Sequence, residues 1–180
     1  LSFLRNRLGR LGARSAAPAL TLFEHLDSLE CAGEGFAVLE AALATHPDDA
    51  LLRVEFVEAL IRHGRLAEAD RLLGPSGQGF RRASWLRARA MLAEVQGDMP
   101  AALVASREAS VLQPLNLAHH RMVARLLAST ESQTAALDHI RAACARHPQH
   151  YGLNRLLYAW LPRGTTDEAA QPPLRARLSP

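Results

Sequence analysis

The feature that most restricts the fold of this chain is an internal repeat of 33 to 34 residues. When the sequence is shifted against itself by that length, alanines, glycines and prolines coincide at several places. The coinciding pairs are Ala102 with Ala136, Ala109 with Ala143, Pro114 with Pro148, Gly64 with Gly97, and Ala69 with Ala102. A repeat of this length indicates supersecondary units that bury their apolar faces on their neighbours.

The repeated residues predict pairs of helices joined by tight turns. Gly64 and Gly97 can take the left-handed conformation that ends a helix. Asp98 can cap the helix that follows, with Pro100 in its first turn. The repeated alanines allow two helix axes to approach closely, and the repeated prolines end the second helix of each pair. Because 48% of the residues are hydrophobic and only 5% are aromatic, with Ala and Leu dominant, the composition is also typical of close-packed helices.

This arrangement resembles the tetratricopeptide repeat (TPR) family, in which each repeat is a helix A, a tight turn and a helix B. Residues 83–116 match best, with the turn at Gly97. Residues 117–150 match with Glu131 in place of the turn glycine, and residues 50–82 and 16–49 match less completely. The resemblance implies an all-α fold, a right-handed α-solenoid of antiparallel helix hairpins with about four TPR-like repeats plus a terminal helix.

The two ends depart from the repeat. We expect residues 1–15 to form an N-terminal amphipathic helix or a linker, because leucines recur there at helical spacing with arginines between them. The TPR-like helical repeat domain then covers residues 16–161. Residues 162–180 are expected to be a Pro-containing C-terminal tail.

The resemblance implies a concave groove lined by the A helices. The fifth position of three successive repeats is Arg87, Arg121 and Arg155, and the remaining groove residues in our prediction are Met91, Met122 and Arg125. A row of guanidinium groups suits contact with carboxylates, so the expected partner is a protein or peptide segment that is acidic or amphipathic. The alternative interpretation is a solvated face whose charge is partly neutralised by Glu55, Glu58 and Glu94.

Charge and cysteine usage restrict the classes of partner. All 21 basic residues are Arg, which indicates coding bias in a GC-rich genome. Residues 16–162 carry 14 Arg and 16 acidic residues, so this region is not a basic nucleic-acid platform. No apolar run is long enough for a membrane span. Cys31 and Cys144 are far apart, and we interpret them as reduced, buried thiols of a cytoplasmic protein.

No arrangement of residues predicts catalysis, a cofactor or a metal. His119 and His120 point about 100° apart around a helix and cannot easily bind one metal ion together. His147 and His150 flank Pro148 in a turn, but no carboxylate stands close to them in sequence, so a structural or surface role is favoured. The aromatic residues interpreted as core or cap residues are Trp85, Trp160, Tyr151 and Tyr158.

The expected function is therefore that of a non-catalytic protein–protein interaction module, and the chain alone is not expected to be an enzyme. One alternative is a helical scaffold domain of a larger multidomain enzyme, which positions its substrate or its catalytic domain. Another is a homo-oligomer that forms through exposed terminal hairpins.

Overall fold

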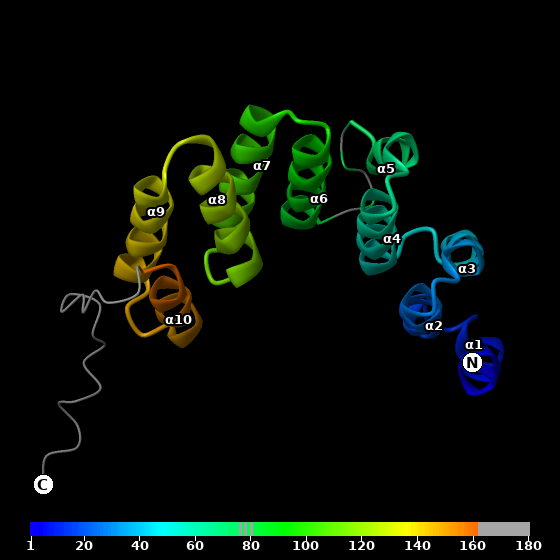
Figure 1. Ribbon diagram of the computed structural model, residues 1–180. Coiled ribbons are helices and arrows are strands. Elements are labelled where there is room, and N and C mark those ends of the chain that lie inside the picture. The colour runs from blue at the N-terminus through cyan, green and yellow to red at the C-terminus, as the bar shows by residue number, and fades with distance from the viewer. Residues whose placement is uncertain (76, 78, 80, 162–180) are drawn as a thin grey trace, which may run out of the picture. The chain divides into compact units, whose positions relative to one another are not determined.

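The computed structural model describes residues 1–75, 77, 79 and 81–161, and the regular secondary structure of this part of the chain consists of helices, without a strand (Figure 1). The predicted all-α class is therefore confirmed. The predicted tail over 162–180 lies outside the described residues. The ten helices are α1 (Ser2–Leu11), α2 (Ala17–Ser28), α3 (Ala32–Thr45), α4 (Ala50–Arg62), α5 (Leu66–Leu73), α6 (Arg82–Val95), α7 (Met99–Leu112), α8 (Leu117–Thr130), α9 (Gln133–Arg146) and α10 (Tyr151–Trp160).

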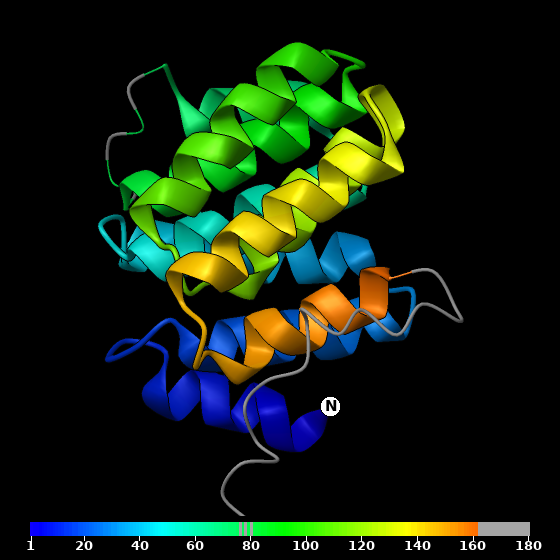
Figure 2. The same ribbon diagram turned by 90° about the vertical axis from the view of Figure 1, so that its left-hand side faces the viewer.

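The chain divides into two compact units, residues 1–92 and residues 93–180, and the predicted repeat domain spans both. In the first unit α1 packs on α2, α2 pairs with α3, and α4 pairs with α5. In the second unit α8 packs against α7, α9 and α10. The antiparallel helices α9 and α10 lie side by side in both views (Figures 1 and 2).

The turns between paired helices repeat at residues 30, 64 and 97. Glu30, Gly64 and Gly97 all have a left-handed backbone, with φ of 59°, 73° and 84°. After each of them, an N–H group donates to the carbonyl five residues earlier, as in a Schellman motif. These bonds join Cys31 to Leu26 at 2.9 Å, Arg65 to Leu60 at 2.9 Å, and Asp98 to Ala93 at 2.8 Å. The prediction for the two glycines is confirmed.

The equivalent fourth turn has a different backbone. Glu131 occupies its repeat position with φ −118°, so it avoids the left-handed region. The closing bond still forms, because the N–H of Ser132 donates to the carbonyl of Leu127 at 3.0 Å. Two glutamates thus stand at equivalent positions, and only Glu30 is strained.

A small buried residue follows each turn by five positions. These residues are Gly35, Ala69, Ala102 and Ala136, and all four are buried. A Cβ atom added to Gly35 would lie 2.9 Å from Cδ2 of Phe23, so α2 and α3 are too close for a side chain there. The first hairpin therefore follows the repeat too. Its small residue is Gly35, which the shift of the sequence against itself did not reveal.

Side-chain caps stand at the start of α4, α7 and α8, among them the predicted cap Asp98. Asp49 accepts hydrogen bonds from the N–H groups of Leu51 and Leu52, both at 3.0 Å. Asp98 and Asn116 each cap their helix through one bond of 3.0 Å. These side chains satisfy backbone donors that have no partner inside the helix, which fixes where α4, α7 and α8 begin.

Each unit has its own apolar core. The first is built around the rings of Phe23, Phe36 and Phe56, whose centroids are 5.6 Å and 6.2 Å apart in sequence order. The second is built from residues of α8, α9 and α10, including the fully buried Ile140 and Leu153. In both cores the helices pack closely, because the residue five positions after each turn is small.

Replacing Glu30 by Gly is expected to stabilise the protein by about 1 kcal/mol, because glycine removes the steric cost of a left-handed backbone. The measurement is the free energy of unfolding in urea. Glu131→Gly is the matched control, and it should stabilise nothing since Glu131 is not left-handed. Equal effects of the two substitutions would contradict this account of the first turn.

Candidate functional site

The predicted groove residues lie on three helices and in both units. Arg87 and Met91 are on α6 in the first unit. Arg121, Met122 and Arg125 are on α8 and Arg155 is on α10, all in the second unit. We therefore describe the two groups separately.

In the first unit, Arg87 is paired inside the protein. Its guanidinium donates to the carboxylate of Glu58, a residue of α4 that is only 7% exposed. Burial raises the pKa of Glu58, while the positive charge of Arg87 opposes that rise. Met91 is half-buried and packs against the core of this unit. Arg87 therefore compensates a buried charge, which limits what it can offer to a ligand.

Arg125 is also paired, within the second unit. It donates two hydrogen bonds to Glu94, one of them from Nη2 to Oε2 at 2.7 Å. Met122 is buried beside these residues. For Arg87 and Arg125, the structure thus agrees with the alternative interpretation, in which nearby carboxylates neutralise part of the row.

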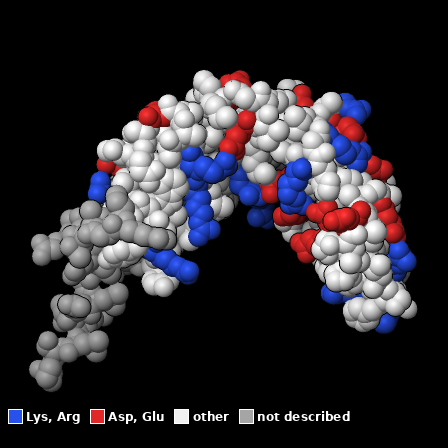
Figure 3. All heavy atoms as spheres, viewed as in Figure 1, with Lys and Arg blue, Asp and Glu red and all other residues white. Residues whose placement is uncertain are grey.

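Arg121 and Arg155 differ from the other two. Both side chains are exposed, and neither has an ion pair with a carboxylate in the described part of the chain. Figure 3 shows arginine side chains over α8 and next to α10. Of the predicted row, these two guanidinium groups are the ones that remain available to a carboxylate from outside.

Two tyrosines share the exposed face of α10 with Arg155. Tyr151 and Tyr158 stand four residues before and three residues after Arg155, which places all three on one side of the helix. Tyr151 is 74% exposed and Tyr158 is 45% exposed. The prediction that they belong to the core was therefore wrong, because α10 buries its leucines and turns its tyrosines outward.

Gly152 brings this face close to α8. A Cβ atom added to Gly152 would lie 2.7 Å from Cδ1 of Leu117, the first residue of α8. The N-terminal turns of the two helices are therefore in direct contact. Tyr151 is the first residue of α10, and Arg121 lies one helical turn after Leu117 in α8. We call the set Arg121, Tyr151, Arg155 and Tyr158 the α8–α10 face.

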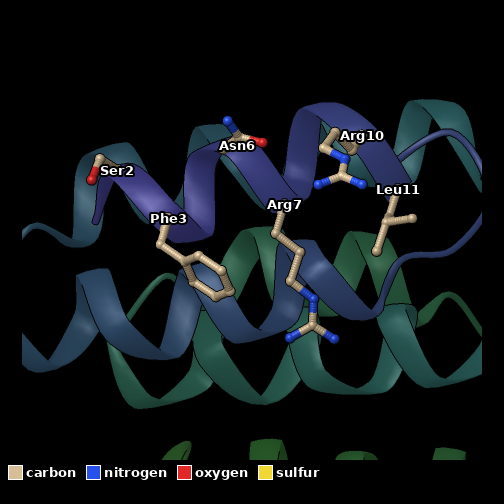
Figure 4. A pocket seen from close by; sticks show the side chains of 6 residues that line it. All are labelled: Ser2, Phe3, Asn6, Arg7, Arg10 and Leu11. Carbon is tan, nitrogen blue, oxygen red and sulfur yellow. The ribbon is translucent and has the colours of Figure 1, made fainter.

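A second surface feature is a hollow along α1, in the first unit. It has a volume of about 510 Å³ and is lined by residues of α1 alone. Phe3, Arg7 and Leu11 project from the same side of the helix (Figure 4). No residue of α1 is fully buried, although Leu8 packs against the core of the unit. The helical alternative predicted for residues 1–15 is thus observed over Ser2–Leu11.

The cysteines and histidines were only partly predicted. Cys144 is buried, and its burial raises the pKa of the thiol. Cys31 is exposed at the start of α3, so the prediction of a buried thiol was wrong there. His119 and His120 are both buried. Within the described residues, no group of three or more His, Cys, Asp or Glu side chains is placed to hold a metal ion.

Comparison with known proteins leaves the chain without an assigned family. No family model matches its sequence, and no curated protein matches it at a significant level. Among the ten helices described, none combines the length and apolar character that a membrane-spanning segment requires. A functional interpretation therefore depends on the residues and their geometry.

Proposed function

We propose that this chain is a non-catalytic protein–protein interaction module that binds an acidic or amphipathic peptide segment. In this proposal the hairpins stack as a TPR-like right-handed α-solenoid. The support is the register of turn and crossing residues, which recurs at intervals of 34, 33 and 34 residues along the chain. A constant register gives successive hairpins the same geometry, which is the basis of a solenoid.

The observation that carries the proposal is the α8–α10 face. Among the residues that the structure describes, Arg121 and Arg155 have no carboxylate partner, and both are exposed. Tyr151 adds a large, exposed aromatic ring. Arginine and tyrosine are the residues most enriched at protein interfaces, where a ring supplies buried area and a guanidinium supplies paired hydrogen bonds. A peptide with acidic side chains beside an apolar one complements this combination.

The other predicted groove residues have supporting roles in this proposal. Arg125 pairs with Glu94 of α6, and the side chain of Met122 is buried. Arg87 and Met91 belong to the first unit. We expect direct contact with the peptide chiefly at Arg121 and Arg155, since they lose no internal ion pair when they bind.

Selection from a random peptide library tests this function. Wild-type protein should enrich sequences rich in Asp and Glu, and the enrichment should weaken at high salt because the charges are exposed. The Arg121→Glu, Arg155→Glu double variant should lose that enrichment. Because each exposed charge contact contributes about 1 kcal/mol when it becomes buried on binding, reversing two of them should weaken binding by at least about tenfold.

The matched control is the Arg7→Glu, Arg10→Glu double variant. It makes the same change of net charge on α1, in the first unit. This control should enrich the same acidic peptides as the wild type. Equal loss of enrichment in both double variants would show that net charge, and not the α8–α10 face, governs the selection.

A further inference from the structure

A small basic pocket lies in the second unit, on residues that the α8–α10 face does not include. It has a volume of about 190 Å³ and opens between α7, α8 and α9. Its polar and charged lining residues are Arg107 and Ser110 from α7, His120 from α8, His139 and Arg146 from α9, and His147 just after α9. This volume is smaller than that of most pockets that hold a drug-sized ligand, so the pocket suits a single functional group.

The two histidines at the back of the pocket form an ordered chain of hydrogen bonds. Nε2 of the buried His120 lies 2.8 Å from the carbonyl oxygen of Pro114. A carbonyl only accepts, so this nitrogen carries the proton. Nδ1 of neutral His120 is then an acceptor, and Nε2 of His139 donates to it at 3.1 Å. This order leaves Nδ1 of His139 as the one ring nitrogen outside the chain.

The charged and titratable residues that line the pocket are all Arg or His. The charged and titratable neighbours that act on His139 are His120 on α8, Arg107 on α7 and Arg146 on α9. Those that act on His120 are Arg146, His147 and His150. All of them are basic. None of the described residues that line the pocket is acidic. Arg107 itself has a carboxylate neighbour, because Glu131 lies 3.6 Å from its guanidinium with its side chain half-exposed.

Burial and this positive field disfavour the charged form of both rings. Burial, followed by the charges of His120, Arg107 and Arg146, lowers the pKa of His139 to about 4. Burial likewise lowers the pKa of His120. A bound anion would reverse the field, because it stabilises an imidazolium in contact with it.

We propose that this pocket binds a phosphate group, with Arg107 and Arg146 as fixed positive partners and His139 as a donor through Nδ1. Two guanidinium groups and an imidazolium match the charge and the three terminal oxygens of a phosphate better than those of a single carboxylate. Binding takes up a proton at His139, so affinity increases as the pH falls from 7 toward 5.

Titration with inorganic phosphate, followed by NMR of the histidine ring protons, tests this site. Ionic strength is held constant with sodium chloride. Phosphate should shift the ring signals of His139 and His120 to saturation and raise the pKa of His139 by about two units. Sulfate, which stays dianionic over this pH range, should also bind more tightly at pH 5.5 than at pH 7. That result assigns the pH dependence to the protein.

Substitutions identify the partners. Arg107→Gln and Arg146→Gln should each weaken phosphate binding by about tenfold, since each removes a charge-assisted contact. Arg141→Gln is the matched control: Arg141 is also on α9 but does not line the pocket, and binding should be unchanged. Circular dichroism checks that each variant is folded.

Three outcomes would overturn the proposal. The first is that chloride alone produces the same ring shifts, which would mean general screening. The second is that the two pocket variants bind phosphate as well as the wild type does. The third is that acetate binds as tightly as phosphate at equal ionic strength, which would make the pocket a carboxylate site instead.

Discussion

Replacing Arg87 by Ala is expected to destabilise the protein by about 3 kcal/mol. Removing one member of a buried ion pair leaves the other charge unpaired, which costs about 3–5 kcal/mol when burial is complete. Glu58 is 7% exposed, whereas the Arg87 side chain is 28% exposed, which places the expected cost at the lower end. Glu55 adds to the cost because its negative charge also raises the pKa of Glu58.

The measurement is urea unfolding at two pH values. Since the pKa of Glu58 is already raised in the folded protein, its carboxyl is easier to bury when protonated. The contribution of a group with a raised pKa is complete at low pH and is lost as the pH rises through that pKa. Removing Arg87 raises this pKa further, so the cost of Arg87→Ala should be largest near pH 7 and smaller near pH 4.

A double variant separates the charge from the packing. Arg87→Ala combined with Glu58→Leu removes both charges and should recover most of the lost stability. If Arg87→Ala alone costs less than about 0.5 kcal/mol, in the range of exposed pairs, then Glu58 is effectively solvated and this account of the first unit is wrong.

The second large effect expected is a loss of stability in mild acid, caused by His139 and His120. The pKa of His139 is lowered to about 4 in the folded protein, against an ordinary value of 6.5. The unfolded chain therefore binds more protons than the folded chain between these two values. The contribution of neutral His139 to the free energy of unfolding is complete above pH 6.5 and is lost as the pH falls toward 4.

The size of this effect follows from the shift. One pKa unit corresponds to 1.36 kcal/mol, so His139 alone accounts for up to about 3 kcal/mol over the whole interval. His120 adds a loss in the same direction. Urea unfolding at several pH values between 7 and 4 measures the total.

A pair of substitutions isolates the histidines from the carboxylates that also titrate. His139→Gln should make the dependence of stability on pH clearly shallower between 6.5 and 4. His25→Gln, at an exposed position of α2, should leave that dependence as it is in the wild type. If the His139→Gln curve runs parallel to that of the wild type, the ring is not buried in its neutral form.

Local chemistry made much of the fold predictable. Gly64 and Gly97 are followed by a cap or a small buried residue at fixed distances, so a shift of the sequence against itself reveals the hairpins. The first hairpin was less visible because Glu30 stands where the two middle turns have Gly, and Gly35 stands where the other three hairpins have Ala. Their equivalence depends on backbone angles and helix separation, and no residue type marks it.

The candidate sites depended more on tertiary contacts. Helical register placed Arg87 and Arg125 on the predicted face, but their partners, Glu58 and Glu94, lie on other helices. Whether such a carboxylate reaches the guanidinium depends on packing, which spacing alone does not reveal. No feature of the sequence indicated that His139 is a site residue, since it meets His120 only because α8 and α9 pack together.

The orientation of the tyrosines in α10 was also predicted wrongly, because it depends on which face of the helix is packed. Tyr151 was assigned to the core or a cap because aromatic residues are often buried. Helix α10 instead buries Leu153, Leu156 and Leu157, so the face that carries Tyr151 is left to solvent. The helical period of the leucines in this segment was the available signal for that orientation.

The central claim is that an acidic peptide binds on the α8–α10 face. The most direct measurement is the change in backbone amide NMR signals of the wild-type protein when a selected acidic peptide is added. We predict that the largest changes lie around Arg121 in α8 and around Tyr151 and Arg155 in α10. Changes that are confined to α1, or to the pocket between α7, α8 and α9, would contradict the claim.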